Sequence, residues 1–207
     1  MSGPPDVAIE GRAVTLAAQR LRELSATAER AAGSLTAEIA RAAAMVRATV
    51  VGGGTLFFCG NGGSAADAQH MATEYVVRYM KNRRAMRAVA LTTDTSLLTA
   101  AGNDFGFDEI FARQVDGLAR PGDLLIIHST SGNSPNVLRA AEAARSRGVG
   151  VLALSARDGG RLRALADHSV VVPTDRTDRA QELHLCIEHL ICELVESELE
   201  EDAEGGA

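Results

Sequence analysis

Five short apolar runs, separated by helical patterns, most constrain what this chain can fold into. The runs are 55–59, 87–91, 124–128, 149–154 and 169–172, and the helical stretches between them are 64–80, 95–118 (interrupted by Gly-rich residues at 102–106), 135–147 and 158–166. Each run is apolar throughout rather than alternating, which is typical of parallel strands covered on both faces. The sequence therefore predicts an α/β fold built on a doubly wound sheet of five parallel strands.

Helical regions flank this predicted sheet at both ends of the chain. From Glu10 to Val51 the sequence is Ala-rich with apolar residues at helical spacing, broken near Gly33-Ser34 and stopped by Gly52–Gly54. This pattern predicts two amphipathic helices, or one long kinked helix. These helices carry more apolar surface than one sheet edge can cover, so we expect them to pair with another copy of the chain.

The length of 207 residues suits one domain over 1–207 with a full core. Within it, 1–51 would serve in oligomerisation, and a last helix is expected over 177–200. The acidic and Gly-rich residues 201–207 are expected to form a disordered tail.

Charge argues against a nucleic-acid partner. The net charge is −6, and the dense basic run is Lys81-Asn82-Arg83-Arg84, whereas a nucleic-acid surface needs a broad Lys/Arg footprint. An anionic ligand must therefore be held by local dipoles and hydroxyl groups.

The three cysteines favour a reducing, cytoplasmic location. Cys59, Cys186 and Cys192 form no C-x-x-C pair, and their apolar surroundings predict that all three are small buried hydrophobic residues. The N-terminus lacks the basic-then-apolar order of a signal peptide, and no apolar run reaches membrane-spanning length. We expect no membrane partner.

The first polar loop, Gly60-Asn61-Gly62-Gly63-Ser64-Ala65, follows a predicted strand and opens a helix. Its G-x-G-x-x-A spacing allows a dinucleotide site, which would need an acidic residue at the end of the second strand. Asp94 is acidic but comes late. A purely steric need for Gly in a tight turn is a second alternative. A Walker site is excluded because no Lys follows.

The second polar loop carries four hydroxyl groups, on Ser129, Thr130, Ser131 and Ser134, just before a helix that begins near Pro135. Backbone N–H groups, hydroxyls and a helix N-terminus can hold a phosphate without a Lys. Helix capping alone is the alternative, but one such residue would satisfy it. Two such loops in one parallel sheet predict a pocket for a small phosphorylated molecule such as a sugar phosphate.

His70 and Glu74 are four residues apart on the helix after the first loop, so they share a face. A His and a carboxylate at this spacing can bind a divalent metal such as zinc, although a solvated helix face is a common alternative. On the last helix lies His189, whereas Glu182, His184 and Glu188 are predicted to be exposed.

Several motifs along the chain, taken together, resemble a known family. GNGGSAADAQHMATE, ALTTDTSLLTAAGNDFGF, STSGNSPNVLRAAEAA and DRAQELHLCIEHLICELVE resemble the sedoheptulose 7-phosphate isomerases (phosphoheptose isomerases) of the sugar isomerase (SIS) domain superfamily, in order, over about 35–197. The resemblance implies a SIS-type, flavodoxin-like sheet with additional N-terminal helices, a homotetramer with interfacial active sites and one zinc ion per site.

The resemblance also implies roles for individual residues. Glu74 would be the catalytic base and His189 its acid/base partner, and zinc would be bound by His70, Glu74, Gln181 and His189. Substrate would be held by Asn61, Gly62, Gly63, Ser64, Glu74, Asn103, Asp104, Ser129, Thr130, Ser131, Ser134 and Gln181. The implied reaction converts sedoheptulose 7-phosphate to D-glycero-D-manno-heptose 7-phosphate through an enediol(ate).

These side chains suit that chemistry, since a carboxylate can move a proton between neighbouring carbons while a His manages protons on the oxygens. A non-catalytic SIS-domain regulator that binds a protein partner, such as a replication initiator, is the alternative. The joint presence of His70, Glu74, Gln181 and His189 favours the enzyme.

Spacing on the last helix suggests a site shared between chains. Gln181 and His189 are eight residues apart, about 12 Å along a straight helix, so one metal reaches both with difficulty. Shared sites would predict that Glu74→Gln and His189→Ala proteins complement each other. Arg78, one turn beyond Glu74, is expected either to meet substrate or to pair with Glu74. Asp178 is expected to cap the last helix, with a substrate contact as the alternative.

Overall fold

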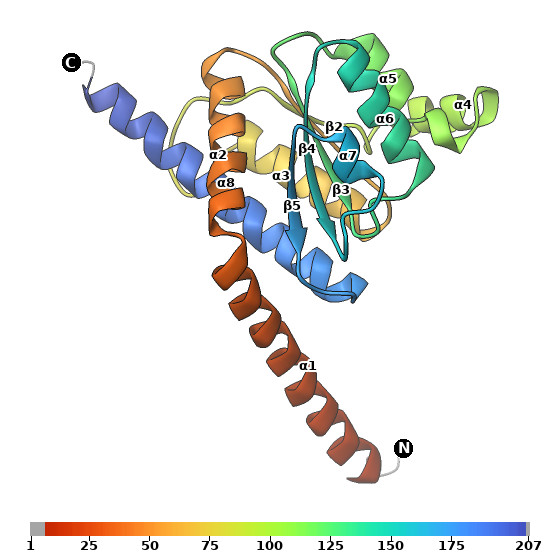
Figure 1. Cartoon of the computed structure of the whole chain (residues 1–207), viewed down its shortest axis with the longest axis vertical. Coiled ribbons are helices and arrows are strands. Elements are labelled where there is room, and N and C mark those ends of the chain that lie inside the picture. The colour runs from red at the N-terminus through yellow and green to blue at the C-terminus, as the bar shows by residue number, and fades with distance from the viewer. Residues whose placement is uncertain (1–6, 206–207) are drawn as a thin grey trace, which may run out of the picture.

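The computed structural model describes residues 7–205, and its centre is a five-stranded parallel sheet (Figure 1). The strands are β1 (Leu56–Gly60), β2 (Ala88–Ala90), β3 (Leu124–Ser129), β4 (Gly150–Ala156) and β5 (His168–Val172), in the order β2-β1-β3-β4-β5. All neighbouring pairs are parallel. The predicted α/β class and the five predicted strands are confirmed.

The register explains why the strands are apolar throughout. Leu56 of β1 pairs with Leu124 of β3, which in turn pairs with Gly150 of β4. Along β1 and β3, successive side chains enter two different cores: Phe58 and Ile126 pack into one, and Phe57 and Leu125 into the other. Because a strand presents alternate residues to opposite faces, both faces of the sheet must be covered.

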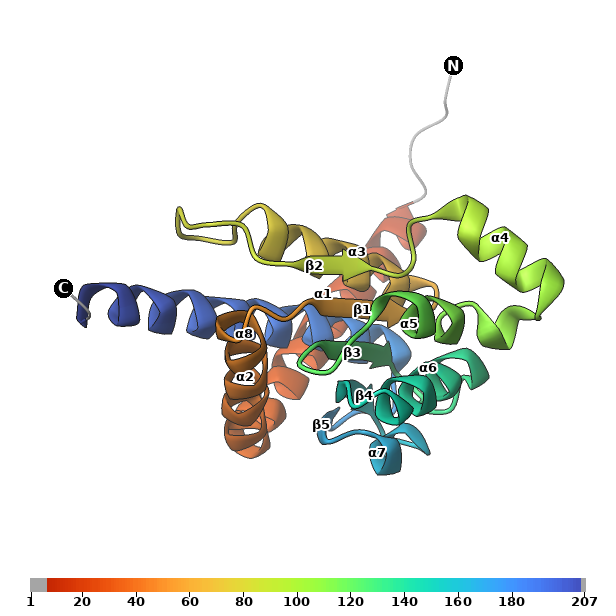
Figure 2. The same ribbon diagram turned by 90° about the horizontal axis from the view of Figure 1, so that it is seen from above.

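Two layers of helices cover the sheet, as Figure 2 shows from above. One core includes residues of α2 (Thr36–Val51), α3 (Gly63–Val76) and α8 (Thr177–Gly205). The other includes residues of α4 (Thr95–Asp104), α5 (Ala112–Leu118), α6 (Pro135–Ser146) and α7 (Leu162–Leu165), with a short 3-10 turn at Phe107–Glu109. The loops that follow β1 and β3 consequently open at the carboxyl edge of adjacent strands.

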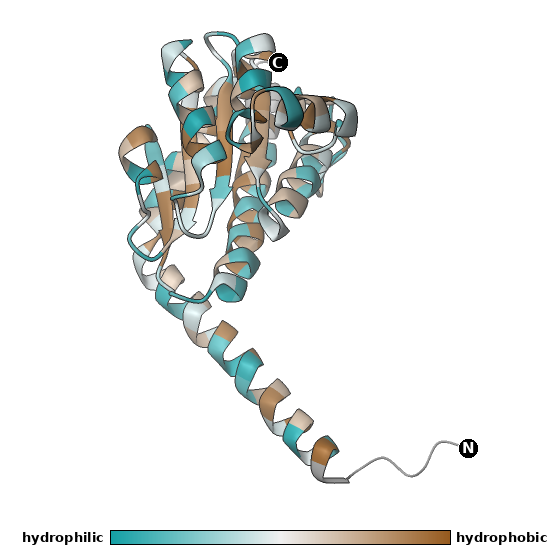
Figure 3. Cartoon of the chain, turned by 90° about the vertical axis from the view of Figure 1, so that its right-hand side faces the viewer, coloured by the Kyte–Doolittle hydropathy of each residue, from teal (hydrophilic) through white to brown (hydrophobic). Residues whose placement is uncertain are grey.

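The N-terminal region forms two helices, α1 (Val7–Ser34) and α2, with the break at Leu35, beside the position near Gly33-Ser34 where it is predicted. The first part of α1 projects away from the rest of the molecule, and Figure 3 shows apolar and polar residues interspersed along it. Its apolar residues Val14 and Leu21 are 65% and 68% exposed. Among the described residues, nothing covers these two side chains.

Helix α3 ends at Val76, four residues before the end predicted for it. The segment that follows is held away from a helical path because its backbone N–H groups bond a carboxylate of α8, as described below. The last helix continues to Gly205, so the disordered tail expected at 201–207 is helical over 201–205. Residues 206–207 lie outside the described part of the chain.

Three expectations about exposure are wrong. Cys186 is exposed, whereas Cys59 and Cys192 are buried as predicted. His184 and Glu188 are 0% and 3% exposed, because they lie on the buried face of α8. The core residues on that face are Ala180, Leu183, Ile187, Ile191 and Val195. Glu182 is exposed as expected and pairs with Arg179 at 2.7 Å. In the described residues, no helix is both long and apolar enough to cross a membrane.

The buried His184 should make stability depend on pH. Burial lowers the pKa of His184 from 6.5 to about 4, so the folded protein keeps the ring neutral. The unfolded chain takes up the proton first as pH falls, so we expect stability to be full above pH 6.5 and to decline toward pH 4. His184→Leu should flatten this decline in urea unfolding curves measured across that range. An unchanged slope would show that His184 does not cause it.

Candidate active site

The first loop turns sharply between β1 and α3. Gly62 has φ of 58°, a conformation that favours glycine. At Gly63 an added Cβ would lie 2.5 Å from Nε2 of Gln181, so glycine here lets the loop approach α8. The steric explanation for these glycines is therefore correct, and it also brings Gln181 against the loop.

The second loop faces the first across a cavity of about 280 Å3. The residues that line it are Asn61, Gly62, Gly63, Ser64, His128, Ser129, Thr130, Ser131, Ser134, Thr177 and Gln181. Asn61 and Asn136 exchange two side-chain hydrogen bonds of 2.9 and 2.8 Å, which fix the two loops relative to each other. Nine of the residues predicted to hold substrate are thus brought to one cavity.

The hydroxyl groups of this cavity are only partly used by the protein itself. Ser134 precedes α6 but its side chain makes no capping hydrogen bond, whereas Ser129 and Ser131 accept N–H groups of their own loop. Capping therefore does not account for the hydroxyl cluster. The cavity combines hydroxyl groups with the N-terminal ends of α3 and α6, which suits a phosphate.

The structure argues against a dinucleotide site, because the acidic residue that such a site would need, Asp94, has another role. The Asp94 carboxylate accepts a hydrogen bond of 2.9 Å from the Leu97 N–H as the N-cap of α4. It is engaged in holding that helix rather than available for a ribose.

A second group of side chains lies further along α3 and α8. Nε2 of His70 is 3.2 Å from Oε1 of Glu74 and 3.1 Å from Nε2 of His189. One ligand atom from each of these three residues lies within 4.8 Å of the other two. The predicted base and its predicted partner therefore meet within a single chain.

This group has the composition of a metal site. Two imidazole nitrogens and a carboxylate oxygen that converge so closely need a shared proton or a cation between them, and this donor set suits zinc. Burial lowers the pKa of His189, and the nearby His70 lowers it further. The neutral imidazole favoured in this way is the form that binds metals.

Gln181 is not in this group but in the loop cavity, where it lines the wall beside Gly63. Eight residues, about 12 Å of helix, separate it from His189. The loop cavity and the group of His70, Glu74 and His189 therefore lie at two levels along the same pair of helices.

Asn103 and Asp104 are brought to neither place. They lie at the end of α4, both exposed, with Nδ2 of Asn103 donating to Oδ1 of Asp104 at 2.8 Å. Figure 2 shows that α4 extends away from α8. The structure of one chain therefore does not bring these two residues to the loop cavity or to the group of His70, Glu74 and His189.

For Arg78 and Asp178 the structure bears on one of the two alternatives, the pairing of Arg78 with Glu74 and the capping role of Asp178. Arg78 is exposed beyond the end of α3, so it makes no helical pair with Glu74. Asp178 lies inside the first turn of α8 rather than before it. Its pKa is held well below the usual range, first by hydrogen bonds from Arg176.

Sequence reasoning missed the groups that surround the site. The Tyr79 ring stacks on His189, and His128 is fully buried at the end of β3, 2.6 Å from the Glu188 carboxylate. Burial disfavours protonation of His128, but the Glu188 charge outweighs it and raises the pKa of the imidazole. The apolar stripe of α8 could have placed Glu188 in the core, whereas nothing local indicates the position of Tyr79.

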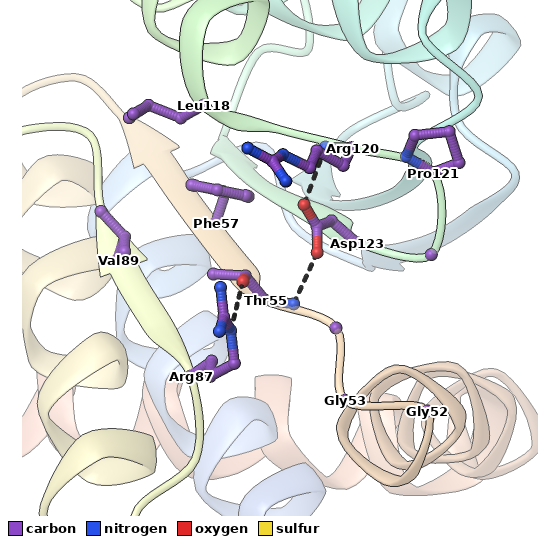
Figure 4. Close-up of a pocket in the computed structure, with 12 residues that line it drawn as sticks. Gly52, Gly53, Thr55, Phe57, Arg87, Val89, Leu118, Arg120, Pro121 and Asp123 are labelled. Carbon is purple, nitrogen blue, oxygen red and sulfur yellow. Dashed lines mark hydrogen bonds between the residues drawn. The ribbon is translucent and has the colours of Figure 1, made fainter.

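A larger cavity, about 520 Å3, lies at the opposite edge of the sheet, near the amino ends of β1 and β3 (Figure 4). Its Asp123 accepts the backbone N–H groups of Thr55 and Arg120 at 2.7 and 2.8 Å. That carboxylate holds the turn together. The lining of this cavity includes none of the residues predicted for the active site.

Comparisons with known proteins agree with this geometry. Residues 20–156 match the SIS domain family. The chain is 50% identical over 170 residues to the phosphoheptose isomerase of Akkermansia muciniphila, covering 82% of this chain and 90% of that protein. It is 52% identical over 167 residues to that of Rhodospirillum rubrum, covering 81% and 89%.

A solved structure of phosphoheptose isomerase GmhA from Neisseria gonorrhoeae superposes with a TM-score of 0.84 at 43% identity, covering 88% of this chain and 98% of that one. The fold and its loop cavity thus define a SIS domain of the sugar-phosphate isomerase class. More particularly, the chain belongs to the phosphoheptose isomerase family and is an enzyme of that class. The resemblance seen in its motifs is confirmed.

Proposed function

We propose that this enzyme converts sedoheptulose 7-phosphate to D-glycero-D-manno-heptose 7-phosphate at a zinc site, in the cytoplasm. The observation that carries the proposal is the convergence of Glu74, His70 and His189 on the same two helices that border the loop cavity. The two levels are about 12 Å apart along α8. This separation suits a sugar whose phosphate lies several carbons away from its reacting carbonyl group.

The loops bind the phosphate, and the chain of the sugar extends toward Glu74. Glu74 removes a proton from C1 of the ketose, which leaves an enediolate, and returns it to C2. His189 transfers the hydroxyl proton of O1 to O2, so that the carbonyl moves from C2 to C1 with no net gain or loss of protons.

His70, Glu74 and His189 are the residues that would hold zinc, whereas Gln181, which the resemblance also assigns to the ion, lies in the loop cavity of the same chain. The metal would supply Lewis-acid stabilisation of the negative charge that develops on the sugar oxygens. A carboxylate bound to a metal is a weaker base, so Glu74 would have to be free of the metal when it accepts the proton from C1. A complex in which Glu74 remains ligated and far from C1 would contradict this step.

Initial rates with ketose phosphates of five, six and seven carbons test the function. We expect the seven-carbon substrate to have the highest kcat/KM, loss of activity after chelation and recovery with zinc. Comparable rates for all three substrates would contradict the proposed match between phosphate and carbonyl sites.

The alternative, a non-catalytic regulator that binds a protein partner, gains no support from the site. A regulator does not need a carboxylate and two imidazoles converging beside an anion cavity. Absence of isomerase activity from the zinc-loaded protein with every ketose phosphate would restore this alternative.

We further propose that the enzyme is a homotetramer. The exposed apolar residues of α1, and an apolar groove of about 450 Å3 between α2 and α8 that includes Ile39, Leu190 and Leu194, provide surface for self-association. In such an assembly, Asn103 and Asp104, which do not line the loop cavity of their own chain, could meet the site of another chain.

The geometry reverses the expectation for mixed variants. Because Glu74 and His189 meet in one chain, a mixture of Glu74→Gln and His189→Ala proteins should gain no activity after subunit exchange, since every site then lacks one of the two groups. Native mass spectrometry of differently tagged chains provides the control for exchange. Recovered activity would show that the base and its partner come from different chains.

A further inference from the structure

Tyr79 lies flat against His189. The two ring centroids are 5.0 Å apart and the planes differ by 15°. On another side, His70 approaches His189 with a centroid separation of 5.1 Å at 60°. The imidazole of His189 therefore has an aromatic ring on one face and the His70 ring beside it, which limits its rotation.

The position of Tyr79 is set by a carboxylate on α8. The backbone N–H groups of Tyr79, Met80 and Lys81 donate to the Glu196 carboxylate at 3.0, 3.0 and 2.9 Å. Glu196 lies seven residues after His189, two turns along the same helix. One helix thus carries both His189 and the group that holds Tyr79 over it.

Arg83 completes the connection to the helix that carries Glu74. Its Nε donates to Glu196 at 2.8 Å, while its terminal nitrogens donate to the backbone oxygens of Glu74 and Tyr75 at 2.8 and 2.9 Å. The last carbonyl groups of a helix lack partners within it, so Arg83 caps α3 while it is paired with α8. The Arg83–Glu196 pair thus connects the end of α3, which carries Glu74, to α8, which carries His189.

The pair is too buried to be an incidental surface contact. The Glu196 side chain is 1% exposed and that of Arg83 12%. Removing two charges from water is costly unless their remaining hydrogen bonds are made, and here both carboxylate oxygens accept hydrogen bonds. Such a satisfied network gives the segment 77–84 one defined position rather than many.

We propose that Tyr79 is a positioning residue that orients the imidazole of His189 by stacking, and that the Arg83–Glu196 pair holds Tyr79 in place. The ring rather than the hydroxyl does this, because the contact is between ring faces. The catalytic consequence rests on the proposed function, whereas the orientation of His189 does not.

Histidine-labelled protein, kept metal-free with chelator, gives a direct measurement. A stacked aromatic ring shifts the Cε1–H resonance of His189, so Tyr79→Leu should move this resonance while Tyr79→Phe leaves it nearly unchanged. Tyr79→Met, which fills a similar volume without a ring, serves if the Leu variant fails to fold. His168 is remote in sequence and hydrogen bonds to Glu38 of α2, so its resonance is the internal control.

Kinetics of the zinc-loaded enzyme separate positioning from binding. Tyr79→Leu should lower kcat about tenfold or more, with KM changed less than about twofold, since misorientation of a catalytic group costs rate rather than affinity. Tyr79→Phe should retain nearly all activity. Glu196→Gln should shift the His189 resonance as Tyr79→Leu does. Glu198 is an exposed residue of the same helix that pairs with Arg47, and Glu198→Gln should leave the His189 resonance unchanged.

A His189 resonance unchanged in Tyr79→Leu would overturn the proposal, as would a loss of kcat in Tyr79→Phe as large as in Tyr79→Leu. If the wild-type enzyme isomerises no sugar phosphate, the proposed function fails, but the resonance still decides whether Tyr79 orients His189.

Discussion

Glu74→Gln is expected to lower kcat by about a thousandfold, the range in which loss of a general base falls. Gln has nearly the same shape but cannot accept the proton from C1. The Glu74 carboxylate is 3.2 Å from His70. The group described here consists of Glu74 and two histidines, so it holds no second carboxylate that could act as the base. Initial rates of aldose formation measure the effect.

The matched control is Glu142→Gln, which removes an exposed carboxylate of α6 that pairs with Arg139. It should leave kcat unchanged. Because Glu74 is also a proposed ligand, zinc content must be measured in parallel, and rates compared at equal occupancy. A Glu74→Gln enzyme that keeps more than about a tenth of its activity at full zinc occupancy would rule out Glu74 as the base.

Glu188→Ala is expected to destabilise the protein by about 3–5 kcal/mol, the usual cost of breaking a buried pair. His128 and Glu188 are 0% and 3% exposed and 2.6 Å apart. Burial raises the pKa of Glu188, an effect that His128 partly offsets. Without the carboxylate, His128 would lose its partner beneath the loop cavity. Urea unfolding at pH 7 measures the loss.

Two further variants separate the pair from general damage to α8. Glu193→Ala, exposed on the same helix, should change the free energy of unfolding by less than about 0.5 kcal/mol. The double variant His128→Leu/Glu188→Leu should lose less than Glu188→Ala, because apolar replacement of both partners leaves no unpaired charge. A Glu188→Ala protein as stable as Glu193→Ala would show that the pair contributes nothing.

Local pattern was enough to predict the sheet and both loops. The apolar runs and the glycines after β1 reflect constraints that act within a few residues, such as burial on two faces and the turn at Gly62. The spacing of His70 and Glu74 placed them on one face of a helix in the same way. The pairing of these residues with His189 required the resemblance to a family, because α3 and α8 are far apart in sequence.

Long-range contacts explain what the sequence could not predict. The end of α3 and the position of Tyr79 depend on Glu196, a residue more than a hundred positions away, so no local pattern indicates them. The polarity of His184 and Glu188 predicts that they are exposed, but they share the buried face of α8 with Ile187 and Ile191. Their burial depends on partners from β3 and β4, the His128 ring and the Ser155 carbonyl.

Proton NMR of the zinc-loaded protein with sedoheptulose 7-phosphate tests most directly whether this carboxylate and imidazole act on a phosphorylated heptulose. An aldose C1–H resonance should appear with the wild-type enzyme and be almost absent with Glu74→Gln. A folded, zinc-loaded wild-type protein that forms no aldose would contradict the proposed isomerase function.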